Sequence, residues 1–318
     1  MVFLNSYNFL RMLPYAFAFL IGVSVMHVTA CSEDQGRLYS RDPVDPNSFG
    51  KAEEDAYSTL LNKYVTADKK IKYISWLSSD DDVARLKALL DAVARLDVTD
   101  KNQDEKKAFY INAYNAMTID LILSHFSETL GAENSPYPNA RSIRNIGNLD
   151  AKVWDEYKWK VAGQTVSLND VEHKILRPMG DARIHFAIVC ASKGCPPILN
   201  RAFNADSLNQ VLDQLADEFV NSGLSTNFDL EKKQINTSQI LSWFSQDFVK
   251  SFGSIKNFFA KYVTVIPSED IAEMRVRYVN YDWLLNIADE DSPPPPEDDD
   301  PPGSGTEEEL GSGSEEVP

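Results

Sequence analysis

The sequence predicts a single mixed α+β domain, with a central buried helix and a small sheet, preceded by N-terminal helices. Three features of the pattern indicate this class. Helical periodicity dominates the middle of the chain, one helical stretch lacks a polar face, and strand-like runs are few and scattered. A doubly wound sheet would require strands that alternate regularly with helices, so the α+β class is favoured.

Residues 1–30 have the layout of a secretory signal. One positive charge precedes an uncharged run over 12–26, and small residues stand before Cys31. A buried helix or a membrane anchor is the alternative, but a spanning helix needs about 20 apolar residues, and Pro14 and His27 interrupt this run. We therefore expect an exported protein from which residues 1–30 are cleaved.

The tetrapeptide Val28-Thr29-Ala30-Cys31 resembles the lipobox of bacterial lipoproteins, with valine where leucine is commonest. The resemblance implies that Cys31 carries lipid and attaches the protein to a membrane. Ser32 at the next position implies the outer membrane, with the domain facing the periplasm. Each buried methylene of a lipid chain contributes about 0.8 kcal/mol, so a multiply acylated cysteine would need no spanning helix.

Segments 31–47 and 288–318 are expected to be a linker and a disordered acidic tail. From Asp289 onward there are twelve acids and no base, which supplies −12 of the formal net charge of −17 and leaves −5 for the rest. Such a composition cannot bury enough apolar surface to offset chain entropy. The tail would be a solubilising end or an arm that binds cations or a partner. Nothing in the chain is basic enough to indicate nucleic-acid binding.

The globular part, 48–287, begins with two predicted helices, 50–64 and 81–96, and a possible short strand at 71–76 between them. The second helix is amphipathic, since apolar residues recur along one side at helical spacing. These residues are Val83, Leu86, Leu89, Leu90, Val93 and Leu96.

The helix expected over 105–126 is apolar nearly all round, which places it in the middle of the fold. Asn112 and Asn115 lie on one side of it at 100° per residue. A buried amide must find a partner, because an unpaired one costs about 1–3 kcal/mol. Both amides are therefore candidate binding residues or members of a buried polar network.

The second half of the globular part alternates short helices and strands without a regular order. A hairpin over 157–166 turns at Ala162-Gly163, and a capping box at 167–170 opens a helix that Pro178 stops after Arg177. Further along we expect a buried strand at 184–189, a helix at 206–219, a hairpin at 228–235, helices at 238–248 and 254–262, and a strand at 275–281.

Glu172 is the exceptional residue of the helix that follows the capping box. At 100° per residue from Leu168 it falls at about 40°, inside an apolar stripe, whereas His173 falls on the margin. A carboxylate that faces a core needs a cation, a metal or several donors, or its pKa rises. Glu172 is thus a candidate catalytic residue, and His173 a candidate binding residue.

His185 lies on the expected strand 184–189, both faces of which are apolar. A satisfied core histidine is the ordinary interpretation of such a residue. Glu172 on the preceding helix suggests another one, because the two side chains could pair across the interface or share one polar group. Each would otherwise be a buried ionisable group without compensation, which costs several kcal/mol.

Cys190 and Cys195 enclose a turn-rich loop that carries Lys193. An exported protein could join them in a disulfide. Alternatively Cys190 is a reactive thiolate, with its pKa lowered by Lys193 and by backbone amides. Five strand residues would put His185 about 16 Å away on the other face, so it could not be the base. A lone C-x4-C pair is a weak zinc motif, and no metal or other cofactor is expected.

Four segments resemble the DUF547 family of uncharacterised proteins: 109–116, 167–173 with Arg177, 184–196 and 281–286. They cover a core of 101–286. The family includes exported bacterial proteins and plant proteins in which the domain follows a coiled coil. Its activity is not established. The resemblance implies that eight residues meet in space, namely Asn112, Asn115, Glu172, His173, His185, Cys190, Cys195 and Asp282.

Two functional hypotheses follow. The first is a binding or structural module at the cell envelope, with a buried Asn/Glu/His/Cys cluster. The alternative is a cysteine- or histidine-dependent hydrolase or acyltransferase, loosely like the papain and transglutaminase group, with Glu172, His185 and Cys190 as catalytic candidates. Under either hypothesis the candidate binding residues are Asn112, Asn115, His173, Lys193, Cys195 and Asp282.

Overall fold

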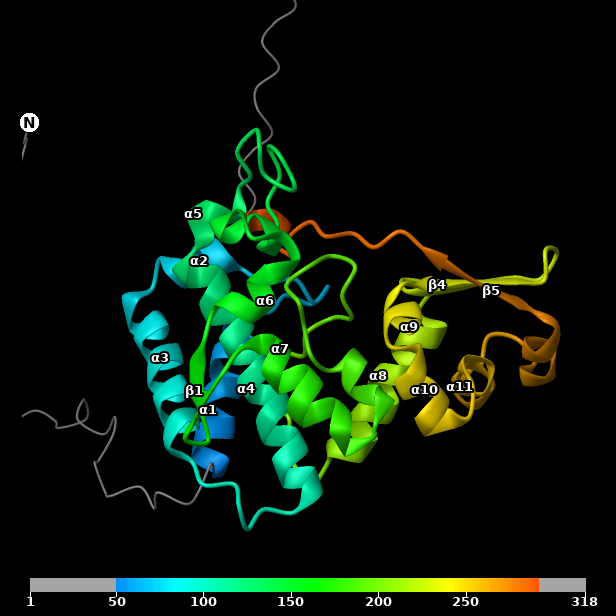
Figure 1. Cartoon of the computed structure of the whole chain (residues 1–318), viewed down its shortest axis with the longest axis horizontal. Coiled ribbons are helices and arrows are strands. Elements are labelled where there is room, and N and C mark those ends of the chain that lie inside the picture. Colours follow the sequence, from blue (N-terminus) through cyan, green and yellow to red (C-terminus); the bar gives the residue numbers. More distant parts are fainter. Residues whose placement is uncertain (1–49, 292–318) are drawn as a thin grey trace, which may run out of the picture. The chain divides into compact units, whose positions relative to one another are not determined.

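The computed structural model describes residues 50–291. The expected signal segment, Cys31, the linker and the tail from 292 onward lie outside the described residues. Within 50–291, no helix has both the length and the apolar character needed to cross a bilayer. The fold is mixed α+β, as the sequence predicts, with a two-stranded and a three-stranded sheet among many helices (Figure 1).

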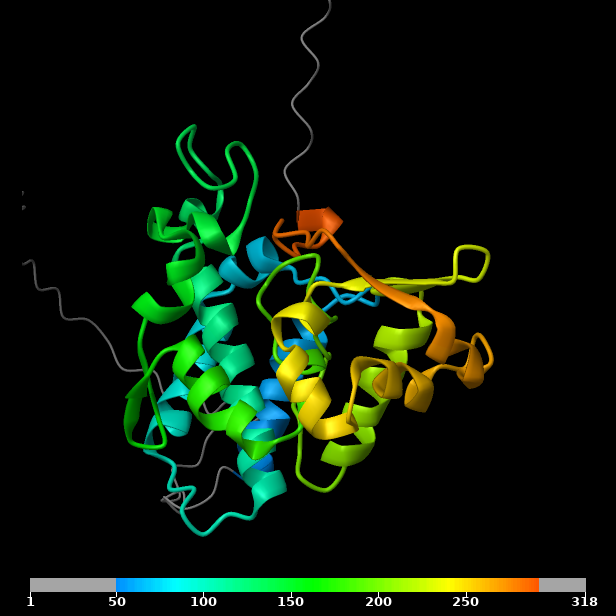
Figure 2. The ribbon, with the colours of Figure 1, turned by 45° about the vertical axis from the view of Figure 1, so that its right-hand side comes forward.

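The long helix α4 (Gln103–Ser124) is the centre of the fold, and every residue from 107 to 123 is buried. A capping box opens it, since Asn102 accepts from Asp104 and Glu105 while the Glu105 carboxylate accepts from the Asn102 amide. Helix α3 lies on one side of α4, whereas α9 to α11 lie on the other (Figures 1 and 2). The prediction of a central buried helix is confirmed.

The N-terminal helices are α1 (Lys51–Tyr64), α2 (Tyr73–Leu77) and α3 (Asp80–Arg95). The predicted strand at 71–76 is wrong. Ile71 forms only isolated bridges with Val65 and Ile287, and the chain then turns into α2. Tyr73 and Trp76 are both fully buried three residues apart, a spacing that places two side chains on one face of a helix but on opposite faces of a strand.

The predicted first hairpin is confirmed as β1 (Trp159–Val161) and β2 (Gln164–Val166), with Trp159 opposite Val166. Ala162 and Gly163 both have positive φ, 48° and 75°, as a type I′ turn requires. The turn docks on the end of α3, because Ala162 N donates to Val93 O over 2.9 Å. Short helices α5 and α6 precede it, at Phe126–Thr129 and Val153–Glu156.

The second sheet has the order β3-β4-β5, with β3 antiparallel and β5 parallel to β4. It packs with helices whose aromatic side chains form a continuous cluster around Phe186 and Phe258. The strands are Thr226–Asp229, Gln234–Ser238 and Arg275–Val279, and the helices are α8 (Leu208–Asn221), α9 (Ile240–Trp243), α10 (Ser245–Phe252) and α11 (Ile255–Tyr262).

Residues 288–291, which their composition assigns to the predicted tail, belong to the packed domain. Asp291 is buried and accepts from Ile74 N over 2.7 Å and from Ser75 Oγ over 2.7 Å. Its carboxylate caps the first turn of α2, where free backbone N–H groups attract an anion. Composition alone could not show that Asp291, one of the twelve acids from Asp289 onward, is buried at the start of α2.

Candidate functional site

The predicted strand at 184–189 is wrong, and its absence changes the site. A 3-10 helix, Ala182–Phe186, replaces it, capped by Asp181, whose side chain accepts from Arg183 N over 3.1 Å. Short apolar runs bounded by turns suit a buried helical turn as well as a buried strand. The separation of about 16 Å between His185 and Cys190 therefore no longer applies, and both residues line one cavity.

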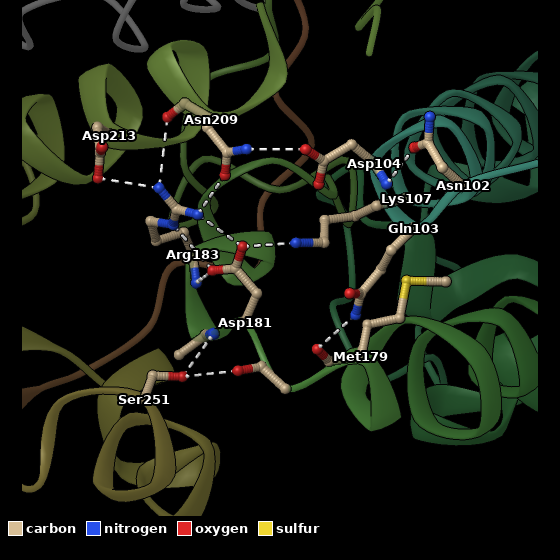
Figure 3. A network of polar contacts seen from close by, with 12 residues as sticks. Asn102, Gln103, Asp104, Lys107, Met179, Asp181, Arg183, Asn209, Asp213 and Ser251 are labelled. Carbon is tan, nitrogen blue, oxygen red and sulfur yellow. Dashed lines mark hydrogen bonds and ion pairs between the residues drawn. The ribbon is translucent and has the colours of Figure 1, made fainter. Parts of the chain in front are cut away.

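A buried ionic network fixes this 3-10 helix (Figure 3). The Asp181 carboxylate lies between Lys107 of α4, at 2.7 Å, and Arg183, at 2.8 Å. Arg183 continues the network to Asp213 of α8, at 3.0 Å. The lysine side chain is only 6% exposed, so each charge depends on the others for compensation. The network positions His185, two residues further on.

Both asparagines of α4 hold backbone segments. Asn115 donates to Ala187 O over 2.9 Å and accepts from Val189 N over 2.9 Å, so it fixes the chain that leads to Cys190. Asn112 makes the same pair of bonds with Phe203. Neither asparagine lines the cavity that holds Cys190. They are supports of the loops around the site, and not members of the cluster that the resemblance implies.

The cavity at Cys190 has a volume of about 200 Å³ and lies between α4, the segment after Ser167, α9 and the segment 281–283. Its floor is polar and its walls are aromatic. The floor consists of Tyr114, Glu172, His185, Cys190 and Cys195, and the walls include Trp154, Trp243, Phe244, Tyr281 and Trp283. His173 also lines it, from an exposed position.

Glu172 is held in the cavity floor by an irregular helix. The capping box at Ser167 forms as predicted and opens α7 (Leu168–Asp170), which continues as a π-helix, Val171–Leu176. Such wide turns are frequent at functional sites. The Glu172 side chain is 12% exposed and accepts one hydrogen bond, from Tyr114 Oη at 3.3 Å. Burial, reinforced by the nearby Cys190, raises its pKa to about 7.

His185 lies between two carboxyl groups. Its Nε2 is 2.9 Å from Asp247 Oδ2, and its Nδ1 is 4.0 Å from Glu172 Oε1. The ring stacks on Phe244 at 3.8 Å, and burial lowers its pKa below the usual value. Glu172 and His185 are neighbours, as expected, but the hydrogen-bond partner of the histidine is Asp247, which the sequence interpretation did not single out.

Asp247 of α10 connects His185 to Arg177. Burial opposes its ionisation, yet hydrogen bonds from His185 and Arg177 hold its pKa well below the usual range. Arg177 Nε donates to Asp247 Oδ2 over 2.6 Å, and Nη1 lies 2.5 Å from Nδ1 of His173. An ionised Asp247 accepts the Nε2 proton of a neutral His185, which leaves a lone pair on Nδ1 facing Glu172.

The Cys190 thiol is surrounded by polar hydrogens. Its Sγ lies 3.0 Å from Tyr281 Oη and 3.1 Å from Ser192 Oγ, and Cys190 N donates to Cys195 Sγ over 3.2 Å. The neighbouring Cys195, then the two hydroxyls, lower the pKa of Cys190 to about 7 against the opposing effect of burial. Burial and the neighbouring Cys190 raise the pKa of Cys195 well above its usual value. Cys190 is therefore the thiolate of the pair.

The loop that carries Cys190 is clamped by a distant segment. Ala191 has φ 58°, a left-handed conformation that costs about 1 kcal/mol or more without glycine. Backbone bonds stabilise it, since Asn286 N donates to Ala191 O over 3.1 Å. Gly194 approaches so closely that an added Cβ would lie 2.8 Å from Asp282 N. This clamp places Tyr281 beside the thiol.

Lys193 and Asp282 do not belong to the Cys190 cavity. Both line a second cavity of about 420 Å³, to which Cys195 and Tyr281 also contribute. Lys193 is exposed, and the groups that lower the pKa of Cys190 are Cys195, Ser192 and Tyr281 instead. The Asp282 carboxylate accepts from Leu284 N over 2.9 Å and so stabilises its own turn. Of the two possibilities that the sequence leaves open for Cys190 and Cys195, the structure shows free thiols and not a disulfide.

The comparisons with known proteins identify a family domain in this chain but do not indicate an activity. No curated protein and no solved structure matches the chain. The matched family model covers residues 98–220, which include Glu172, His185 and both cysteines of the cavity but neither Asp247 nor Tyr281. Over these residues the chain carries a DUF547 domain, from the family described as "Protein of unknown function, DUF547".

Proposed function

We propose that the cavity at Cys190 is a thiol-dependent acyl-transfer site, which makes the domain a hydrolase or an acyltransferase. The observation that carries the proposal is the position of the Cys190 sulfur. It lies 3.0 Å from a tyrosine hydroxyl, on the floor of a cavity that also holds a carboxyl group with a pKa of about 7. This arrangement supplies a nucleophile and an acid in one place.

Cys190 needs no histidine to become a nucleophile. Cys195, Ser192 and Tyr281 stabilise the thiolate, so a larger fraction of the thiol is ionised at neutral pH than in an unperturbed cysteine. A thiol with an unperturbed pKa of about 8.5 would be only a few per cent ionised there. The thiolate attacks the acyl carbon of an ester, thioester or amide and forms a thioester on Sγ.

Glu172 supplies and recovers the proton. In its protonated form it gives a proton to the departing alcohol, thiol or amine. In the second half-reaction its carboxylate takes a proton from water, or from another acceptor, as that group attacks the thioester and releases the Cys190 thiolate. His185 and Asp247 position Glu172, because the Nδ1 lone pair faces its carboxyl group at 4.0 Å.

The walls of the cavity indicate an apolar or planar acyl group. Trp283 lies 5.6 Å from Trp154 and 5.7 Å from Trp243 between ring centroids, so the three rings form one cluster. A volume of about 200 Å³ admits a short acyl group or the end of a longer one. Predominantly apolar walls with a few convergent polar groups are typical of small-molecule sites.

The test is acylation of the purified protein by a series of p-nitrophenyl esters. We expect one equivalent of nitrophenol in a fast phase and an acyl group on the tryptic peptide 184–193. Cys190→Ser should lose both, whereas Lys193→Arg should keep both, because that side chain is exposed outside the cavity and the trypsin site is retained. Equal acylation of wild type and Cys190→Ser would overturn the proposal.

The second candidate function is a binding module, which one observation favours. Trp243, in the wall of the cavity, is 45% exposed, and exposed aromatic side chains beside a cavity are typical of ligand sites. A binding module would take up an apolar ligand without forming a covalent adduct. The ester experiment separates the two functions, since only the enzyme forms a thioester at Cys190.

We further propose that the mature chain is a lipoprotein held in the outer membrane through Cys31, with the domain in the periplasm. The lipobox-like sequence before Cys31 supports this proposal. Labelled palmitate in a bacterial host should mark the wild type but not Cys31→Ala. Label retained by that variant would contradict the anchor, because the other two cysteines lie inside the domain.

A further inference from the structure

We propose that Cys190 and Cys195 form a redox pair: a hydroperoxide oxidises Cys190, Cys195 resolves it as a disulfide, and a dithiol restores the site. The inference goes beyond acyl transfer and does not depend on it, because it needs only the two thiols. It assigns a role to Cys195, whose sulfur forms no bond with the acyl group in the acyl-transfer steps.

The two cysteines are close together in the reduced protein. Cys190 N donates to Cys195 Sγ over 3.2 Å, and both cysteines line one cavity. A turn brings Cys195 back, since its own N–H donates to Ser192 O over 3.1 Å. Cysteines far apart cannot be bridged without backbone movement, whereas here the turn already brings the Cys195 sulfur to the backbone of Cys190.

Oxidation of the two thiols by a hydroperoxide needs no other group of the protein. The Cys190 thiolate attacks one oxygen of the peroxide, which breaks the O–O bond, gives the sulfenic acid Cys190–SOH and releases hydroxide or an alkoxide. Cys195–SH then attacks the oxidised sulfur, and its proton leaves with the hydroxyl as water. Two thiols and one hydroperoxide thus become a disulfide, water, and a second water or an alcohol.

Oxidation of Cys190 makes Cys195 easier to ionise and therefore more reactive. In the reduced site, the negative charge and the hydrogen bond of Cys190 help to keep Cys195 protonated. The sulfenic acid is neutral, so both effects disappear once Cys190 is oxidised. Cys195 then ionises more readily at the moment when a thiolate is needed.

Two cavities meet at this pair. Cys190 lines only the cavity with Glu172, whereas Cys195 lines that cavity and also the larger one with Lys193 and Asp282. A dithiol can therefore reach Cys195 from the larger cavity without entering the cavity of Cys190. The oxidised site would be closed to acyl substrates, because the Cys190 sulfur is bonded, but would stay open to reduction.

The test uses the full chain and hydrogen peroxide, followed by trypsin without a reductant. Lys193 lies between the two cysteines, so a Cys190–Cys195 disulfide joins the separate peptides 184–193 and 194–201. We expect these linked peptides from the wild type and their loss after dithiothreitol. Cys195→Ser should instead keep a sulfenic acid on Cys190, which dimedone traps, and Cys190→Ser should leave Cys195 as a thiol.

Lys193→Arg is the matched control, because it changes an exposed side chain of the same loop and keeps both thiols and the trypsin site; it should give the linked peptides as the wild type does. Dimedone trapped on wild-type Cys190, with no linked peptides, would overturn the pair by showing that Cys195 does not resolve it. Peroxide that leaves both thiols unmodified would overturn it as well. In either case, ester-dependent acylation of Cys190 decides separately whether the proposed acyl transfer stands.

Discussion

Two sets of buried polar side chains differ in how many of their hydrogen-bonding groups have a partner. Asn112 and Asn115 each make two hydrogen bonds of 2.7–2.9 Å to backbone groups. Glu172 accepts one bond of 3.3 Å and has His185 at 4.0 Å. The first set is complete and holds loops in place, whereas the second has unused hydrogen-bonding capacity directed into a cavity. Both sets are buried. A side chain with all its hydrogen-bond partners has a structural role, whereas one with unused hydrogen-bonding capacity in a cavity is a candidate for chemistry.

The largest effect should come from Asp247, which compensates both His185 and Arg177. Asp247→Ala should reduce the free energy of unfolding by about 3–5 kcal/mol, because it leaves two donors without their carboxylate. Combined with His185→Ala, the loss should be smaller than the sum of the single losses. Urea unfolding of the four proteins measures this coupling. Strict additivity would show that the two residues act independently.

Asn115→Ala should cost about 3 kcal/mol, because Ala187 O and Val189 N would both remain buried without a partner. The same change should slow alkylation of Cys190, since the chain leading to it is released. Asn112→Ala is the matched control: it should cost a similar amount and leave alkylation unchanged, as its partner is Phe203. If both variants slowed alkylation of Cys190 equally, Asn115 would have no specific role in positioning the chain that leads to Cys190.

Glu172→Gln should show its effect in the pH dependence of stability. The folded pKa, about 7, is raised above the usual 4.5, so the folded state holds a proton that the unfolded state has lost between these values. Wild-type stability should therefore fall, relative to the variant, as pH rises from about 4.5 to about 7, by on the order of 2 kcal/mol. Other groups shift both proteins equally. A pH-independent difference would show that Glu172 titrates normally.

The smallest effect concerns Asp291, a buried acid with complete partners. Ending the chain after Ile287 should lower the free energy of unfolding by about 1 kcal/mol, since it removes the bonds to Ile74 and Ser75. Ending it after Asp291 should change nothing measurable. Thermal unfolding of the two truncated proteins and the full chain makes the comparison. Identical unfolding curves would show that Asp291 does not stabilise the fold.

Helical periodicity was sufficient to predict α3 and α4, and the turn at Ala162-Gly163 was sufficient to predict the first hairpin. The residue pattern failed at 184–189, where five apolar residues and His185 show no clear period and suit either a strand or a helical turn. The wrong strand then gave a wrong separation of His185 and Cys190. Local spacing also correctly placed Glu172 in an apolar stripe.

The partners of the site residues could not be predicted, because they come from distant parts of the sequence. Asp247 is 62 residues from His185, and Tyr281 is 91 residues from Cys190. Asp247 is the one acid of the amphipathic helix α10, and nothing local shows that it faces a buried histidine and not solvent. The role given to Lys193 was the ordinary expectation for a cation near a thiol, and it failed because the loop directs that side chain to solvent.

The close approach of Gly194 to Asp282 bears on how the domain can be produced. A fragment cut at the limits of the family match, 98–220, would contain the cysteine loop but not the segment 281–286 on which it rests. Ala191 would lose the Asn286 amide that stabilises its left-handed conformation, and the thiolate would lose Tyr281. Such a fragment would be a poor reagent for screening substrates. A chain from 50 to 291 keeps the segment 281–286 and, with it, both contacts.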